Sequence, residues 1–416
     1  MEVQFLGGCR EVGKSAIMIS SKGGTNALLD YGIELQPEIK YPIFPKRRID
    51  VVIPSHAHLD HSGSVPLLFK NYDPKVFMTD VTFELVDLLM KDFFKIARRN
   101  KRLLKFSKKE YKKMKRNLEM INYREPFSVG DIDFELYDAG HIPGSAGILL
   151  TTEGKNIFYT GDIKLKDTEL LKGCDLPKDK IDLLIIESTY GERNHPSRKS
   201  EEREFLSEVD YALNQEEYAL VPVFAVGRAQ ELMLVLKGYE RYTILDGMAK
   251  EATRIILRYS KYLRRPGDLA KIFNKIKIIE NDRDRRNVLK KPHIILATAG
   301  MLSGGPIVFY LKKLKDRRES RLLFVGFQVE ETPGYHVLQS GIYKSNEVEF
   351  DVKCKIRKFD FSAHADRGEL FKIIKKLNPE KIVCVHGDDP QKFAEDIKSE
   401  LGMDAIAPAN GEKIML

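Results

Sequence analysis

The chain has 416 residues, of which 43% are hydrophobic and 31% are charged. This composition is too apolar for a chain that is disordered throughout, and the length favours two domains over one core. The 69 basic residues outnumber the 61 acidic ones, and the net charge of +8 is compatible with a polyanionic partner. The longest apolar runs fall short of the roughly 20 residues of a membrane helix, and the N-terminus does not resemble a signal peptide. We therefore expect a cytoplasmic protein that does not bind membranes.

The first half of the chain predicts short strands, because apolar residues follow a β rather than a helical register. Strands are expected at 3–6, 16–20, 26–30 and 51–54, and again at 134–137, 148–152, 156–160 and 183–187. Between these two groups, from residue 81 to about 122, the pattern changes to long basic amphipathic helices.

Helices alternate with apolar strands between residues 193 and 346, which is the pattern of a parallel sheet with crossover helices. These strands are expected at 219–222, 242–245, 294–297 and 321–324. A hairpin over 347–361, a helix over 368–377 and a strand over 381–385 are expected to follow. The chain is therefore predicted to contain an α/β insert in a β-rich host, with host parts 1–190 and 347–416 and an insert at 191–346.

A dense group of metal-binding side chains follows the expected strand 51–54. The string Ser55-His56-Ala57-His58-Leu59-Asp60-His61 places three histidines and one aspartate within six residues. At a strand-to-helix turn, several imidazoles and a carboxylate can converge on one point, and such ligands suit zinc. The four cysteines form no CxxC pair, so a thiolate zinc site is not indicated. Clustered surface histidines are the alternative.

Three further candidate ligands each follow an expected strand and precede a turn. They are His141 in YDAGHIPGSAG, Asp162 in FYTGDIK and His386 in IVCVHGDD. Each is weak alone, because a single histidine is more often structural. Strand ends share one edge of a sheet, however, so these residues can meet the first four and give the seven ligands that two bridged metals need if they share a water.

The order of these motifs resembles a known family. Asp30, the HxHxDH string, His141 and Asp162 are similar to motifs one to four of the metallo-β-lactamase fold. Glu187 in IIESTYG, His364 in DFSAHAD and His386 in CVHGD resemble its β-CASP branch. The strings LGGCREVGKS, PVFAVGRAQEL and ATAGMLSGGP, and GFQ followed by TPG, are similar to archaeal relatives of the cleavage and polyadenylation specificity factor nuclease.

The resemblance covers essentially the whole chain and implies a metallo-β-lactamase αββα sandwich, interrupted by an inserted α/β β-CASP domain with a parallel sheet. It also implies two zinc ions, expected about 3.5–4 Å apart. The implied ligands are His56, His58 and His141 for one ion, Asp60, His61 and His386 for the other, and Asp162 as a bridge. Asp30 would orient the ligand loop from outside. His195, His293 and His336 match no ligand motif and are expected away from the metals.

The implied reaction is hydrolysis of RNA phosphodiester bonds, in which two zinc ions activate a shared water and neutralise developing charge. Asp60 and Asp162 would serve this step as ligands. His364 would protonate the leaving 3′ oxygen and Glu187 would orient it. Position 386 favours RNA over DNA, because the RNA-acting members resemble this chain in having His there.

Residues that contact RNA are harder to predict. Ser303 and Gly304, in the loop 299–305, could present backbone NH groups to a phosphate, although this loop could equally be a simple strand-to-helix connection. Ser362 is a candidate beside His364. The segment 91–124 contains fourteen Lys or Arg against three acids, with Lys101 and Arg102 as candidates and interleaved aromatics that could stack on bases. A solvated helical face is the more frequent explanation of such a segment.

The sequence thus favours a zinc ribonuclease, an endonuclease that could also have 5′-to-3′ exonuclease activity, in RNA 3′-end processing or decay. One alternative is a non-catalytic RNA-binding scaffold of a processing complex, which usually has decayed ligands, whereas all seven are present here. The other is a small-molecule metallohydrolase, which explains HxHxDH but not the basic insert or the His364 motif. A homodimer or a processing-complex partner is left open.

Overall fold

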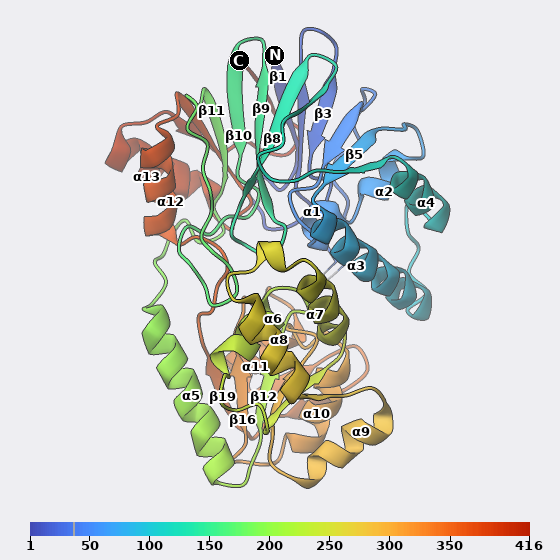
Figure 1. Ribbon diagram of the computed structural model, residues 1–416, viewed down its shortest axis with the longest axis vertical. Helices are drawn as coiled ribbons and strands as arrows, with labels where there is room; N and C mark the ends of the chain where they lie inside the picture. The colour runs from blue at the N-terminus through green and yellow to red at the C-terminus, as the bar shows by residue number, and fades with distance from the viewer. Residues whose placement is uncertain (36–37) are drawn as a thin grey trace. The chain divides into compact units, whose positions relative to one another are not determined.

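The computed structural model describes residues 1–35 and 38–416, and the chain divides into two compact units (Figure 1). Unit 1 comprises residues 1–167, 172–194 and 364–416, and unit 2 comprises residues 168–171 and 195–363. The chain therefore leaves unit 1, builds unit 2 and returns, as expected for a host fold that is interrupted by an insert. None of the helices that the structure describes is both long and apolar enough to cross a membrane.

Unit 1 contains two sheets with helices on their outer faces, which confirms the predicted αββα sandwich (Figure 1). In spatial order, the strands of the first sheet are β22 (Lys413–Met415), β1 (Glu2–Gly7), β2 (Ala16–Ser20), β3 (Asn26–Leu29), β4 (Val51–Ile53), β5 (Lys75–Met78) and β6 (Leu118–Met120). Those of the second sheet are β21 (Ala405–Ile406), β20 (Lys381–Val385), β11 (Leu183–Glu187), β10 (Lys155–Tyr159), β9 (Ala146–Thr152), β8 (Ile132–Asp138) and β7 (Phe127–Val129). The helices of this unit are α1 (Leu59–Ser62), α2 (Val65–Leu68), α3 (Asp80–Arg99), α4 (Lys108–Arg116), α12 (Arg367–Leu377) and α13 (Pro390–Leu401).

The middle strands of the second sheet are buried on both faces, and their side chains alternate between two cores. In β10, Ile157 and Tyr159 point into the core between the sheets, whereas Phe158 joins the core beneath α12 and α13. The side chains of β11 alternate in the same way, with Ile185 facing the first sheet and Ile186 facing the helices. This two-sided burial explains why these strands are continuous apolar runs rather than alternating ones. Each fully buried side chain of this size contributes about 1.5–3 kcal/mol through the hydrophobic effect.

Parallel pairing brings the ends of distant strands to one edge of each sheet. β10 pairs in parallel with β11, and β11 pairs in parallel with β20. In the other sheet, β3 and β4 are also parallel neighbours. Residues 160–162 and 386–388 therefore follow β10 and β20 at one edge of the sheet, where Glu187 ends β11 between them. The string 55–61 follows β4 in the other sheet.

The aromatic residues of the basic segment pack against one another between α3 and α4. The ring centroids of Phe93 and Phe94 lie 6.2 and 5.9 Å from that of Phe106, and Phe94 lies 6.0 Å from Tyr111. Phe93, Phe106 and Tyr111 are buried. The possibility that these buried aromatics stack on RNA bases is therefore excluded, because the amphipathic helices α3 and α4 need their apolar faces to hold each other.

Replacing Phe106 with alanine is expected to destabilise the protein by about 3–5 kcal/mol, the usual cost of emptying a buried phenylalanine site. RNA affinity of the folded variant should be unchanged. Urea unfolding and fluorescence anisotropy with labelled RNA would measure the two effects, with Leu103→Ala as control because Leu103 is 97% exposed. Weaker RNA binding at unchanged stability would contradict this interpretation.

Unit 2 is built on a sheet whose neighbouring strands all pair in parallel. Its strands, in spatial order, are β14 (Lys277–Ile278), β13 (Thr243–Asp246), β15 (Ile294–Ala297), β12 (Ala219–Pro222), β16 (Arg321–Phe324) and β19 (Lys355–Lys358). The helices are α5 (Arg198–Asn214), α6 (Arg228–Val235), α7 (Ala249–Arg258), α8 (Pro266–Lys275), α9 (Asp282–Asn287), α10 (Pro306–Leu314) and α11 (Pro333–Ser340), with short 3₁₀ turns at Ser260–Tyr262 and Val288–Lys290. The predicted parallel sheet with crossover helices is confirmed.

The expected hairpin over 347–361 is wrong. β18 (Glu349–Asp351) pairs instead with the preceding β17 (Ile342–Lys344), and β19 joins the parallel sheet beside β16. Val352 and Cys354 are buried in the core of unit 2, so the chain between β18 and β19 runs through this core and does not form a hairpin turn. Unit 2 accordingly extends to residue 363, beyond the boundary at 346 suggested by the sequence.

Candidate metal centre

The ligand string is held by backbone contacts to the loop that follows β3. The amide of Tyr31 donates to the carbonyl of His61 at 2.8 Å, and the amide of Ile33 donates to the carbonyl of Leu59 at 2.8 Å. Gly32 lies between them, where a Cβ atom would be 1.6 Å from the carbonyl oxygen of Asp60. A glycine is therefore required for the two loops to approach this closely.

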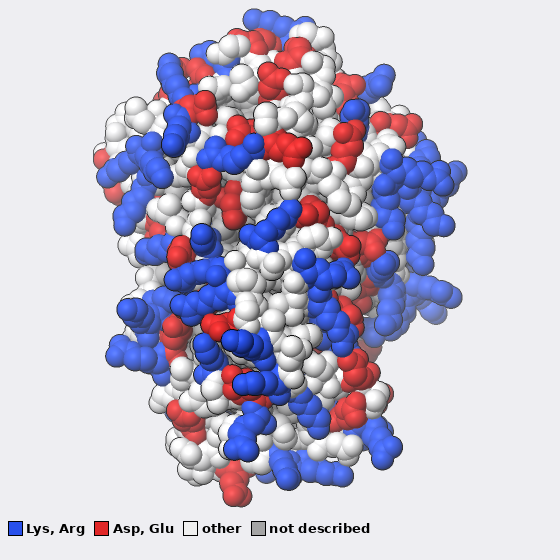
Figure 2. Space-filling view, in the orientation of Figure 1, with Lys and Arg blue, Asp and Glu red and all other residues white. Residues whose placement is uncertain are grey.

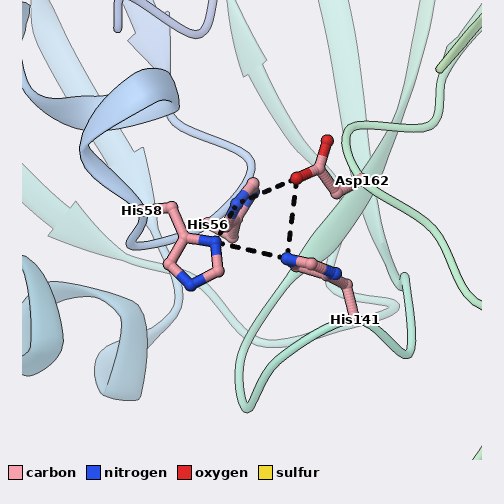
Figure 3. Close-up of side chains that lie close together, drawn as sticks. All are labelled: His56, His58, His141 and Asp162. Atoms are coloured by element: carbon pink, nitrogen blue, oxygen red, sulfur yellow. Dashed lines mark hydrogen bonds and ion pairs between the residues drawn. The ribbon is translucent and has the colours of Figure 1, made fainter. Parts of the chain in front are cut away.

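One group of possible ligands comprises His56, His58, His141 and Asp162, whose side chains point toward one another (Figure 3). His58 Nδ1 lies 3.1 Å from His56 Nε2 and 3.3 Å from His141 Nε2. Asp162 Oδ2 lies 3.4 Å from His56 Nε2 and 3.5 Å from His141 Nε2. Ligand atoms about 2.0–2.1 Å from a tetrahedral zinc lie about 3.3–3.4 Å from one another, so these four atoms have the spacing of a zinc site.

A second group comprises Asp60, His61 and His386. His61 Nε2 and His386 Nε2 lie 3.8 and 3.6 Å from Asp60 Oδ2. The other oxygen of Asp162, Oδ1, lies 3.3 Å from His61 Nε2. One carboxylate thus faces the first group with Oδ2 and the second with Oδ1, which is the arrangement of a bridging ligand.

Two polar atoms of this second group, and the Asp162 oxygen that faces it, are buried without a hydrogen-bond partner. They are His61 Nε2, Asp162 Oδ1 and His386 Nε2. Leaving a buried polar atom unsatisfied costs about 1–3 kcal/mol, more when it is charged, and three such atoms facing one point are rare in a stable fold. A divalent cation would satisfy all three, and the mixture of imidazole and carboxylate ligands suits zinc. The residues present therefore fit the implied metal.

Asp30 fixes the orientation of His61 from outside the ligand groups. His61 Nδ1 donates to Asp30 Oδ2 at 2.7 Å, because an ionised carboxylate can only accept. The lone pair of His61 is thereby directed to Nε2, which is the atom that faces Asp60 and Asp162. Asp30 also accepts from the Ser55 amide at 2.5 Å and from the Tyr159 hydroxyl at 2.6 Å, and it is fully buried.

The electrostatic balance of the cluster favours metal-binding protonation states in most of its members. Burial lowers the pKa of His56 and His58, so both imidazoles are neutral, as a ligand must be. Burial alone would raise the pKa of Asp162, but His61 and His386 outweigh it and hold that pKa well below its usual range. For His61, burial alone would lower the pKa, and the Asp162 and Asp30 carboxylates raise it.

His364 and Glu187 form a pair beside the ligands. His364 Nδ1 lies 3.0 Å from Glu187 Oε2, and the His364 ring centroid lies 4.5 Å from that of His141. Glu187 is buried and also accepts from the amide of Ile163 at 2.6 Å, so its carboxylate is fixed. Burial alone would lower the pKa of His364, but the Glu187 and Asp162 carboxylates raise it.

The remaining predicted residues belong to neither ligand group. Ser303, Gly304 and Ser362 belong to unit 2, whereas Lys101 and Arg102 lie in unit 1 between α3 and α4. Among residues 1–35 and 38–416, no possible ligand group includes His195, His293 or His336.

Several residues around the ligands were missed by the sequence reasoning. Ser55 Oγ lies 3.1 Å from His56 Nδ1, and Thr189 Oγ1 lies 3.3 Å from His386 Nδ1. Lys164 donates to the backbone carbonyl of His364 at 3.0 Å and pairs with the buried Glu369. Ser55, Thr189 and Lys164 lie within motifs that the sequence already marks, which was a usable signal, whereas no local pattern marks Glu369.

Three family models match successive parts of the chain. The model described as "Metallo-beta-lactamase superfamily" matches residues 10–222, "Beta-Casp domain" matches 229–337, and "Zn-dependent metallo-hydrolase RNA specificity domain" matches 349–408.

Named relatives match the full chain. "Probable RNase MJ4" of Methanocaldococcus jannaschii is 42% identical over 100% of both chains. "RNase aCSPSF2" of Saccharolobus solfataricus is 36% identical over 100% of this chain and 85% of that protein. "Transcription termination factor FttA" of M. jannaschii is 37% identical over 100% of this chain and 71% of that protein. A solved structure, "Crystal Structure of a Protein of Unknown Function from Enterococcus faecalis V583", has a TM-score of 0.64 at 18% identity over 100% of this chain and 99% of that one, and it shows the fold alone.

Proposed function

Because this chain belongs to the β-CASP branch of the metallo-β-lactamase superfamily, we propose that it is a zinc-dependent ribonuclease that hydrolyses RNA phosphodiester bonds. The observation that carries the proposal is the Asp162 carboxylate, which faces two ligand groups at once, beside the His364–Glu187 pair. The RNA specificity domain and the ribonuclease names of two relatives support RNA as the substrate.

We assign two zinc ions to the two groups. His56, His58 and His141 would hold one ion, Asp60, His61 and His386 would hold the other, and Asp162 would contact both. When bound, the ions would supply Lewis-acid charge to the phosphodiester and activate water for in-line attack.

The residues around the ligands position the reaction. Asp30 keeps His61 in one tautomer and, through Ser55, fixes the start of the ligand string. Glu187 accepts from His364 Nδ1, so His364 Nε2 is the atom that would deliver a proton to the leaving 3′ oxygen. Protonation by a positioned side chain typically accelerates such a step by about 10²–10⁴. The proposed role is cytoplasmic endonuclease, with 5′-to-3′ exonuclease activity on the cleaved ends, in RNA 3′-end processing or decay.

Incubating the purified protein with 5′-labelled and internally labelled RNA would test the function. We expect cleavage that stops when a chelator is added and returns when zinc is restored, with about two zinc ions per chain by metal analysis. Fewer than one zinc per chain after reconstitution would contradict the metal assignment, and zinc-loaded protein that binds RNA without cleaving it would favour the scaffold alternative. Light scattering on the same preparation would distinguish a monomer from a homodimer.

A further inference from the structure

The outer face of α4 is an array of positive charges. Six of its nine residues are Lys or Arg, in the sequence KKEYKKMKR. Five of these cations line a groove with a volume of 410 Å³, namely Lys108, Lys109, Lys112, Lys113 and Arg116. Lys and Arg side chains gather over α3 and α4 at the right edge of the space-filling view (Figure 2).

The cations of this groove are not neutralised by neighbouring acids. Within the described parts of the chain, no carboxylate forms an ion pair with any of the five groove cations. The nearby acids are engaged elsewhere: Asp87 pairs with Lys115 at 3.0 Å, on another face of α4, and Glu110 accepts from Ser107 in the capping box that begins the helix. Lys108 and Lys112, Lys109 and Lys113, and Lys112 and Arg116 are like charges four residues apart, an arrangement that destabilises a helix.

The helix is nevertheless held firmly. Tyr111 and Met114 are buried, the Tyr111 hydroxyl donates to Asp87 at 2.8 Å, and Lys113 Nζ donates to the carbonyl of Phe69 at 3.3 Å. Phe69 directly follows α2, the helix that comes after the ligand string in unit 1. The cations therefore project from a firmly held helix, in a row that repeats about every 5.4 Å per helical turn, a spacing similar to that between successive phosphates of an RNA strand.

We propose that the α4 groove binds the phosphodiester backbone of RNA outside the metal centre. This inference rests on the proposed ribonuclease function, which supplies the identity of the polyanion. Only Lys and Arg line the groove, so the contact would be to phosphates and independent of base sequence. An anionic membrane is disfavoured, because membrane-surface helices combine a basic face with large apolar side chains that insert into the lipid, and here the apolar face of α4 packs against α3.

The test compares two triple variants in the Asp162→Asn background, which prevents cleavage during binding measurements. The first variant replaces Lys109, Lys112 and Arg116 with glutamine, a residue whose helix propensity is close to that of Lys and Arg. The control neutralises Lys22, Lys155 and Lys180 to glutamine. These three lie near the starts of strands whose opposite ends lead to the metal centre, and each pairs with a carboxylate.

With a 5′-labelled single-stranded RNA as probe, each lost phosphate contact should lower affinity about 5-fold at about 0.1 M salt, so the first variant should lose about 100-fold. The slope of log affinity against log salt concentration should fall by about 2. The control should keep both values. Circular dichroism would show that both variants fold.

Two further measurements separate this proposal from the proposed function. The groove variant with Asp162 restored is expected to cleave long RNA with a raised KM and to hydrolyse a nitrophenyl phosphodiester normally. That result would support both the RNA-binding groove and the ribonuclease function. A wild-type protein that binds RNA through the groove but never cleaves it would retain the groove and remove the ribonuclease. If RNA affinity and its salt slope are unchanged in the groove variant, the proposal that the groove binds RNA is overturned and the ribonuclease proposal is unaffected. The same holds if the groove variant loses binding to phosphatidylserine vesicles but still binds RNA normally.

Discussion

Replacing Asp162 with alanine is expected to abolish RNA cleavage and to lower the zinc content of the protein. Its Oδ2 lies 3.4–3.5 Å from His56 and His141 of the first ligand group, and its Oδ1 lies 3.3 Å from His61 of the second. Both groups should weaken together. The loss of activity should exceed the roughly 10²–10³ that removing one transition-state hydrogen-bond donor costs. Gel assays of labelled RNA and metal analysis would measure the two effects.

Two matched variants guard against a simple folding defect. Asp162→Asn keeps the shape of the side chain but removes the charge, and it should lose activity while RNA binding stays largely intact, because binding depends mainly on phosphate contacts by Lys and Arg. Asp182→Ala removes another buried aspartate, which directly precedes β11 and pairs with Lys155 of β10. This variant should keep its zinc. Asp60→Ala is expected to behave as Asp162→Ala does. Wild-type cleavage in either site variant would defeat the ligand assignment.

The sequence was most informative where the site is local. His56, His58, Asp60 and His61 occupy one turn after β4, and their residue types alone indicate a metal. The contacts of Asp30, by contrast, depend on the tertiary structure. It reaches His61, Ser55 and Tyr159 only because β3 and β4 are parallel neighbours and the two sheets face each other, and no spacing in the sequence contains that information.

Residues of the site that are far apart in the sequence are brought together by strand pairing, and the order of the strands along the chain does not reveal this pairing. In the register of β11 with β20, Glu187 lies opposite Val385, so His386 follows at the same edge although almost 200 residues separate the two strands. Family resemblance could supply His386, Glu187 and His364 as candidates, but their contacts depend on this long-range register. Lys164 holds the His364 loop and lies at the end of the Asp162 motif, whereas its partner Glu369 is marked by neither local motif nor family resemblance.

The errors have a common physical cause, because tertiary packing decided what local pattern could not. Aromatics in a basic helix are compatible with base stacking or with a small core, and the burial of Phe93 and Phe106 decides for the core. Strand-like residues in 347–361 are compatible with a hairpin or with two separate pairings. The burial of Val352 and Cys354 selects the second.

His364 is the residue whose replacement best separates this family from a generic metallohydrolase. If His364 protonates the leaving oxygen, His364→Ala should lower the rate of RNA cleavage by roughly 10²–10⁴, the typical contribution of a general acid. Zinc content should not change, because Nδ1 of His364 is directed to Glu187 rather than to a ligand group. His195→Ala is the matched control, since His195 Nδ1 also pairs with a carboxylate, Asp360 at 2.9 Å, but belongs to unit 2.

The leaving group provides the decisive comparison. A nitrophenyl phosphodiester has an activated leaving group that needs little protonation, so it should be spared much of the loss seen in His364→Ala with RNA. Equal losses on both substrates with zinc retained would instead make His364 a residue that positions the phosphate. Loss of zinc in this variant would mean that the ligand set is wrong, and His386, whose Nε2 lies 3.6 Å from Asp60, would then be the ligand to test again.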